Sequence, residues 1–201
     1  MKIYEALICN RLVSYLEKNK NFSPFQAAFR RHRSTADHIL TLHEIFLRYN
    51  KTGPRNGRLK KRLFLIFLDL KKVFDTVYRS LFFSKLLKAG VRGKMFRVIK
   101  NLFSSNLAQV LIDGFLSPAF VINRGVLQGS KSGSTLFNVF INDLLDSLNN
   151  SNLGVTIGDI QISALGFADD IVLITGCPMK AQGLLNICLT WATTNNMTFK
   201  T

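Results

Sequence analysis

Two short apolar runs that lead into aspartates constrain the fold of this chain more than any other feature. The first run covers residues 63–68 and ends in Asp69. The second covers residues 160–175 and surrounds Asp169 and Asp170, the only adjacent pair of acidic residues in the sequence. Runs of this length, rich in aromatic and β-branched residues, are typical of strands. We therefore predict a strand over 63–68 that is buried on both faces, and a β-hairpin over 160–175 that carries both carboxylates at its tip.

Apolar residues at helical spacing and turn residues assign most of the remaining chain. Two further strands, at 107–112 and 118–123, flank the turn signal Asp113-Gly114. Residues 51–61 combine glycine, proline and basic residues and predict an exposed loop. The predicted helices cover residues 2–19, 35–49, 79–89, 92–104, 134–148 and 180–195. Because helices and strands alternate irregularly, the pattern favours an α+β fold with a mainly antiparallel sheet.

The charge balance of the chain favours a polyanionic partner. Lysine and arginine number 27 against 12 acidic residues, which gives a net charge of +15 over 201 residues. Nucleic acid is the first candidate partner, an anionic membrane face is the second, and a basic surface that keeps the chain soluble is the third reading. No apolar run reaches the roughly 20 residues of a membrane span. Glu5 and Arg11 interrupt the first apolar segment, which argues against a secretory signal and favours an intracellular protein of the nucleus or cytoplasm.

The paired carboxylates predict a bound cation. Asp169 and Asp170 repel each other in apolar surroundings, and no lysine or arginine lies within several residues of them. Oxygen ligands without neighbouring histidine or cysteine favour Mg²⁺ or Mn²⁺ over Zn²⁺. Asp69 is the best third ligand, because it also ends an apolar strand, and three carboxylates suit a pair of divalent ions. The alternative is a turn with two solvated aspartates.

Four blocks of sequence resemble the characteristic blocks of one enzyme family, and they follow one another along the chain in the same order as in that family. Residues 67–77 (FLDLKKVFDTV) resemble the first catalytic block, and Phe167-Ala168-Asp169-Asp170 is similar to the catalytic Asp-Asp hairpin. Residues 125–144, which begin with Gly-Val-Leu-Gln-Gly-Ser, resemble the block that contacts template and nucleotide. Residues 26–35 (QAAFRRHRST) resemble the block that precedes these. Together the blocks cover about residues 3–200, and their combination resembles the reverse transcriptases of non-LTR (LINE-type, jockey-like) retrotransposons.

This resemblance implies an incomplete reverse transcriptase domain over residues 1–201, with a right-hand polymerase palm, partial fingers and no thumb. Residues 1–60 and about 76–105 would form helical elements of the fingers and palm, and residues 61–75 and 106–200 the palm core. The implied reaction is RNA-directed DNA synthesis from a primer 3′-hydroxyl. The implied partners are an RNA template, a DNA primer and deoxynucleoside triphosphates, with two Mg²⁺ ions, which Mn²⁺ can replace, and no membrane.

The resemblance also implies roles for residues near the strand ends. Asp69, Asp169 and Asp170 match the metal ligands, and the Leu70 carbonyl would assist them. Phe74 matches the bulky position that excludes a ribose 2′-hydroxyl. With 17 phenylalanines in the chain, ordinary core packing is the alternative for Phe74.

Four further residues match contacts to nucleotide and template. Gln128 and Gly129 match the nucleotide-binding and template-binding positions of the family. Arg30 and Arg33 would hold template phosphates, and a solvated basic turn is the alternative for both.

The resemblance further predicts that the chain is a truncated copy. Family members carry an Arg-Pro segment upstream of the matched region and a primer grip and thumb downstream. We therefore expect weak binding of Mg²⁺ and nucleic acid, and little or no polymerisation by this chain alone. Two other readings stay open: a non-catalytic nucleic-acid-binding remnant, and a protein similar to group II intron maturases.

Overall fold

The computed structural model of the chain describes residues 2–51, 62–104, 106–126 and 131–200. It consists of two compact units. One unit comprises residues 1–21 and 72–140, and the other comprises residues 22–71 and 141–201. The second unit contains all three aspartates that the sequence singles out.

An antiparallel three-stranded sheet organises the second unit. Its strands are β1 (Phe64–Leu68), β9 (Asp170–Thr175) and β8 (Ala164–Phe167), in the order β1-β9-β8. The register pairs Leu68 with Ile171 across β1 and β9, and Phe167 with Asp170 across β8 and β9. The β8–β9 hairpin therefore turns at residues 168 and 169, at the same end of the sheet where β1 ends.

Helix α2 (Thr35–Lys51) covers one face of this sheet. The helix begins where the sequence predicts, because the Asp37 carboxylate accepts hydrogen bonds from the backbone N–H and the hydroxyl of Ser34. Ile45 of α2 is fully buried in one apolar cluster with Val172 and Ile174 of β9. The hairpin of β6 (Val155–Ile157) and β7 (Ile160–Ile162) contributes further side chains to the same cluster.

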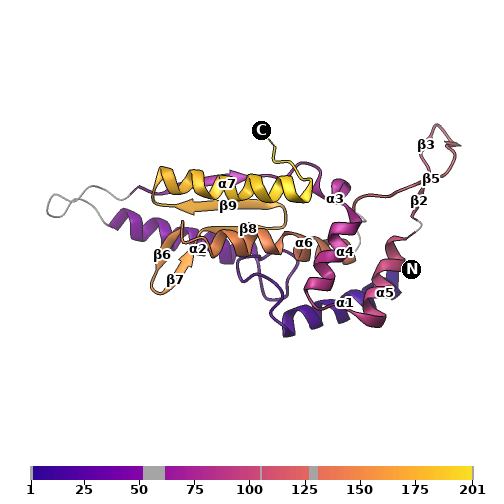
Figure 1. Cartoon of the computed structure of the whole chain (residues 1–201), viewed down its shortest axis with the longest axis horizontal. Helices are drawn as coiled ribbons and strands as arrows, with labels where there is room; N and C mark the ends of the chain where they lie inside the picture. The colour runs from indigo at the N-terminus through magenta and orange to yellow at the C-terminus, as the bar shows by residue number, and fades with distance from the viewer. Residues whose placement is uncertain (1, 52–61, 105, 127–130, 201) are drawn as a thin grey trace. The chain divides into compact units, whose positions relative to one another are not determined.

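The opposite face of the sheet packs against the C-terminal half of α6 (Lys131–Asn149). Residues 171 and 173 alternate with 172 and 174, so they point away from α2. Gly166 lies opposite Ile171, and a Cβ atom on Gly166 would come within 2.9 Å of the Leu145 Cδ1 atom of α6. Helix α7 (Pro178–Asn195) packs against β9 (Figure 1), and its Trp191 donates a 2.8 Å hydrogen bond to Asp143 of α6.

The first unit is mainly helical. It contains α1 (Lys2–Lys18), the single-turn α3 (Val73–Thr76), α4 (Arg79–Lys88) and α5 (Gly93–Phe103). The Tyr15 hydroxyl donates to the Gly90 carbonyl at 2.9 Å, and this bond ties α1 to the turn between α4 and α5. Aromatic rings fill the centre of the unit, and the fully or nearly fully buried ones are Phe82, Phe103, Phe137 and Phe140.

A narrow β-ribbon completes the first unit. Strand β2 (Leu107–Ala108) pairs with β5 (Phe120–Val121), and β3 (Leu111–Ile112) pairs with β4 (Phe115–Leu116). Asp113 and Gly114 both have positive φ angles, as the tight turn between β3 and β4 requires. The turn is confirmed. The predicted strand at 107–112 is divided into β2 and β3, because the Ser117 hydroxyl accepts the N–H of Val110 between the two ladders. Of the predicted strand at 118–123 only β5 is observed, and β4 lies before it.

The α+β class, the antiparallel sheet and the six predicted helices are confirmed. The prediction that residues 63–68 are buried on both faces is wrong. Strand β1 lies at an edge of the sheet, and Phe67 is 75% exposed. An apolar run records side-chain type only, so it does not reveal that Phe67, which pairs with Val172 on the face that α2 covers, stays exposed at the edge of the sheet. Residues 160–162 also pair with β6 and not within the predicted hairpin.

Two other predictions concern the loop at 51–61 and the lack of a membrane span. The predicted loop at 51–61 falls outside the described residues, except for Lys51, which ends α2. No helix within the described residues has the length and hydropathy to cross a membrane.

Candidate functional site

The register of the sheet brings the predicted carboxylates to one end of it. Leu68 pairs with Ile171, so the next residues at this end, Asp69 after β1 and Asp170 at the start of β9, are neighbours on adjacent strands. Asp169 precedes Asp170 in the turn of the β8–β9 hairpin. Asp170 is exposed, and the side chains of Asp69 and Asp169 are half-buried. The three acids therefore lie together at one accessible end of the sheet, where the strands β1 and β9 meet the hairpin turn.

The environment of Asp169 reflects this crowding. Burial raises the pKa of the Asp169 carboxyl above its ordinary value, and the negative charges of Asp170 and Asp69 raise it further. The ammonium group of Lys200 acts in the opposite direction and lowers the same pKa. Asp169 thus senses both other carboxylates, and the three groups share one electrostatic environment that favours a cation.

Lys200 supplies a cation that the sequence did not reveal. Its ammonium group forms an ion pair with the Asp69 carboxylate, although 131 residues separate the two. The backbone holds the segments together, because Lys200 N–H donates to the Asp69 carbonyl at 2.8 Å and Lys71 N–H donates to the Thr198 carbonyl at 2.8 Å. Asp69 raises the pKa of Lys200 by accepting a hydrogen bond from its charged form. Sequence distance hid this contact, which depends on the path of the chain after α7.

The carboxylates fit divalent ions by their chemistry, with one condition. Across residues 2–51, 62–104, 106–126 and 131–200, no three Asp, Glu, His or Cys side chains are already grouped as metal ligands. Asp69, however, already holds a cation in the form of Lys200. A divalent ion at this edge of the sheet therefore requires Lys200 to release Asp69. Leu70, whose carbonyl the family resemblance adds to the ligand set, is buried and bridges to Phe199.

A hollow of about 350 Å³ opens beside the carboxylates, between His38 of α2 and the exposed Phe67 of β1. Asp69 and Asp170 line its polar side, and Phe67, Leu165 and Phe167 line its apolar side. His38 also lines the hollow, where its Nε2 atom lies 3.0 Å from the Gly166 carbonyl. Acidic groups next to exposed apolar surface suit a ligand with two kinds of parts. Its anionic groups would bind the acids through shared cations, and its flat or apolar parts would contact the apolar surface.

Arg30 and Arg33 form hydrogen bonds within the second unit. The Arg30 Nη1 atom donates to the carbonyls of Ser23 and Gln26 at 2.7 and 3.1 Å. Its guanidinium also lies 5.3 Å from the centre of the Phe22 ring. Arg33 donates to the Pro24 carbonyl at 3.2 Å from an exposed position. Arg30 thus supports the loop that precedes α2, and Arg33 remains accessible to solvent.

The predicted nucleotide contacts lie elsewhere in the chain. Phe74 belongs to the first unit, where its half-buried ring packs against Phe137 with 5.0 Å between ring centres. The contact agrees with the core-packing alternative for Phe74. Gln128 and Gly129 lie outside the described residues.

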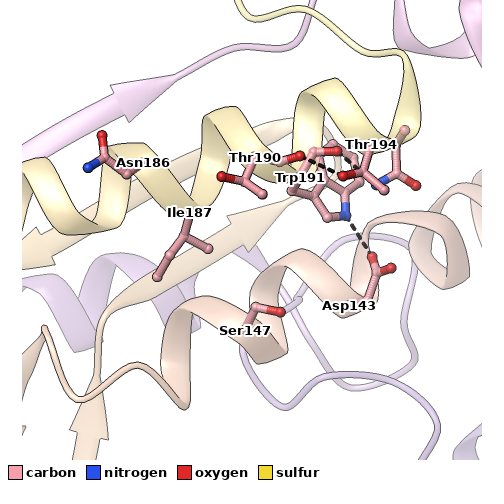
Figure 2. Close-up of a pocket in the computed structure, with 8 residues that line it drawn as sticks. Asp143, Ser147, Asn186, Ile187, Thr190, Trp191 and Thr194 are labelled. Atoms are coloured by element: carbon pink, nitrogen blue, oxygen red, sulfur yellow. Dashed lines mark hydrogen bonds between the residues drawn. The ribbon is translucent and has the colours of Figure 1, made fainter.

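A second hollow, of about 410 Å³, lies between α6 and α7. Figure 2 shows Asn186, Thr190 and Thr194 of α7 on one side and Ser147 of α6 on the other. The Asp143 carboxylate is bound to the indole N–H of Trp191, as the dashed line marks. These residues are polar and largely uncharged, and they do not include Asp69, Asp169 or Asp170.

Comparison with known proteins agrees with this architecture. Residues 1–201 match the family described as reverse transcriptase (RNA-dependent DNA polymerase). The chain is 29% identical over 175 residues to the Pol polyprotein of the type-2 retrotransposable element R2DM of Drosophila melanogaster. It is 28% identical over 174 residues to the RNA-directed DNA polymerase of the mobile element jockey of Drosophila funebris. Each match covers 87% of this chain, which spans only 16% and 18% of the two relatives.

Solved structures show the same fold. Telomerase from Candida albicans, in complex with a fragment of telomeric RNA, matches 97% of this chain with a TM-score of 0.73 and 13% sequence identity. Apo telomerase from Candida tropicalis matches 100% of it with a TM-score of 0.68 and 12% identity. The chain covers 33% and 36% of these two proteins. By the match over its full length, the chain belongs to the reverse transcriptase (RNA-dependent DNA polymerase) family.

Proposed function

We propose that this chain carries the catalytic centre of an RNA-directed DNA polymerase of the non-LTR retrotransposon type. The observation that supports it most is the strand register, which brings Asp69 next to Asp170 at the edge of the sheet where Asp169 also lies. Family membership and the similarity to the R2DM and jockey proteins agree with this proposal.

In this proposal Asp69, Asp169 and Asp170 hold two divalent cations, with the Leu70 carbonyl as a further oxygen ligand. When bound, such ions lower the pKa of an attacking hydroxyl and neutralise charge on a leaving pyrophosphate. The side chains of the chain itself fix where that chemistry happens. Asp69 would have to release its ion pair with Lys200 to hold a metal, and the β8–β9 hairpin carries Asp169 and Asp170 beside the end of β1.

The proposed substrates are a primer paired with an RNA template, and deoxynucleoside triphosphates. The net charge of +15 favours the polyanionic backbone, and exposed Arg33 is available to a template phosphate. The apolar side of the 350 Å³ hollow suits the sugar of the primer end. Phe74 would select deoxyribose by its bulk, and Gln128 and Gly129 would contact the incoming nucleotide and the template.

Primer extension on an RNA template tests this proposal. The assay supplies the 201-residue chain with one labelled deoxynucleotide and Mn²⁺, so that even a single addition is detected. We expect addition of the templated nucleotide, lost in Asp69→Asn and in Asp169→Asn. Asp159→Asn, which removes an equal charge from an exposed turn, serves as the matched control. Addition that persists in both catalytic-site variants would reject the proposal.

A non-catalytic nucleic-acid-binding protein is the second candidate, because the ion pair with Lys200 neutralises Asp69 without a metal. It predicts RNA binding that all three variants retain and no nucleotide addition by any of them.

A further inference from the structure

Backbone groups on the outer edge of β8 form hydrogen bonds with the loop before α2, with His38 of α2, and with the side-chain amides of Gln26 and Asn149. Residues 164, 166 and 168 direct their backbone groups away from β9, because Ser163, next to them, offers its carbonyl to Ile174 of β9. At Gly166 the partner is backbone: its N–H donates to the Phe25 carbonyl at 2.9 Å, and its carbonyl accepts the Ala27 N–H at 3.1 Å. The loop before α2 thus adds a short parallel bridge to the sheet.

At Ala168 the partner is the side chain of Gln26. The Gln26 Oε1 atom accepts the Ala168 N–H at 3.0 Å, and the Gln26 Nε2 atom lies 3.3 Å from the Ala168 carbonyl, to which it donates. Oε1 also accepts the Ala28 N–H at 3.0 Å, which fixes the orientation of the amide. A carboxamide offers a donor and an acceptor in one plane, as a peptide group does. Gln26 therefore extends the hydrogen-bond ladder of β8 to the turn. Only 1% of its surface is exposed.

Ala168 needs such support because of its backbone conformation. Its φ angle is +57°, in the left-handed region that residues with a Cβ atom rarely adopt. It immediately precedes Asp169 and Asp170, so its conformation sets the direction in which the hairpin presents both carboxylates. A second carboxamide, Asn149, makes the same pair of bonds to Ala164 at the other end of the strand, at 3.0 and 3.1 Å.

We infer that Gln26 is a positioning residue of the carboxylate centre: its side-chain amide holds Ala168 in the left-handed conformation and so sets Asp169 and Asp170 for metal binding before any metal arrives. This inference rests on the proposed function for the identity of the centre. Asn149 bonds the same strand at its far end, away from the carboxylates, and so provides a matched control.

Two variants separate positioning from stability. Gln26→Met keeps the side-chain length and removes both bonds to Ala168, whereas Asn149→Leu removes the equivalent bonds to Ala164. Titration of each chain with Mn²⁺, followed by the electron paramagnetic resonance signal of the free ion, measures affinity. We expect Gln26→Met to weaken Mn²⁺ binding by about tenfold or more, and Asn149→Leu to change it by less than about twofold. Addition of Ala168→Gly to Gln26→Met restores part of the loss, because glycine adopts this conformation freely.

A measurement on the unsubstituted chain covers the case in which Gln26→Met does not fold. The inference predicts that the Ala168 amide is already protected from hydrogen exchange without metal, and that Mn²⁺ adds less than about twofold to this protection. An Ala168 amide that exchanges freely until Mn²⁺ is added would overturn it. Equal losses of affinity in Gln26→Met and Asn149→Leu, or no loss in either, would also overturn it. If Asp170→Asn binds Mn²⁺ as well as the unsubstituted chain does, the proposed function fails instead.

Discussion

Asp169 is the residue at which the proposed metal binding and the stability of the fold conflict most clearly. Burial and two neighbouring carboxylates raise its pKa in the folded chain. Since the pKa is higher in the folded than in the unfolded state, charged Asp169 destabilises the metal-free fold at pH values above that raised pKa. The penalty disappears below the unfolded value of about 4, where the carboxyl is protonated in both states. A destabilised group kept at an accessible edge of the sheet suits a binding role.

Asp169→Asn should therefore stabilise the chain in the presence of a metal chelator. We expect its thermal midpoint to rise by about 1–3 °C at neutral pH, with a small size because the side chain is half-buried and solvent screens it. The gain should shrink as the pH falls toward about 4. Calorimetric scans of the variant, of Asp159→Asn and of the unsubstituted chain measure this. A lower midpoint for Asp169→Asn at neutral pH would show that the charge of Asp169 is well compensated.

Lys200 gives the second prediction about a single residue. Because its ammonium group pairs with Asp69, it competes with any divalent ion for that carboxylate. Lys200→Met should therefore strengthen Mn²⁺ binding by about fivefold, the effect of one nearby unit charge in water. Lys94→Met removes the same charge from an exposed position on α5 and should have little effect. Weaker binding by Lys200→Met would mean that Lys200 helps to form the site and does not compete for it.

Two glycines in turns, Gly125 and Gly114, offer a test of how closely neighbouring segments pack. Gly125 and Gly114 have φ angles of +80° and +84°, so alanine is strained at both. A Cβ atom on Gly125 would come within 2.6 Å of the Phe74 carbonyl, whereas nothing lies within 4 Å at Gly114. Gly125→Ala should cost about 2–4 kcal/mol and Gly114→Ala about 1 kcal/mol in urea unfolding. Equal costs would show that the segment at Gly125 moves away from Phe74 easily.

Local signals in the sequence were sufficient for most elements. The spacing of apolar residues identified the helices, and Asp113-Gly114 identified its turn, because both depend on neighbours a few residues away. Strand β1 shows the limit: the six apolar residues at 63–68 predicted a strand correctly, but how far each face is covered depends on elements far along the chain. The pairing of β7 with β6 was missed for the same reason, since Ile160 and Ile162 lead directly into the apolar strand that follows them.

The acids of the candidate site were predictable from the sequence, but the residues that contact and orient them were not. Acids are scarce in this chain, so Asp69 and the Asp169-Asp170 pair stood out, and the register of the sheet confirms that they share one edge. Lys200 and Gln26 did not stand out, because lysines are abundant and a lone glutamine carries no signal. Both act through contacts that span more than 130 residues.

At the scale of the whole molecule, charge should dominate the affinity for nucleic acid. With a net charge of +15, binding to single-stranded RNA should weaken at least about tenfold between 50 and 200 mM salt. Without divalent ions, Asp69→Asn should bind RNA at least as well as the unsubstituted chain, since it removes a negative charge. Fluorescence anisotropy with a labelled RNA measures both. Binding that is insensitive to salt would indicate that the basic surface has another purpose.

The central claim is that Asp69 and the Asp169-Asp170 pair act on the same bound cations. Mn²⁺ titration of Asp69→Asn, Asp170→Asn and the double variant tests it most directly. We predict that each single substitution weakens binding by about tenfold or more, and that the double variant loses little beyond either one, because residues that share a ligand are not additive. Single variants that bind Mn²⁺ like the unsubstituted chain, or losses that simply add, would contradict the claim.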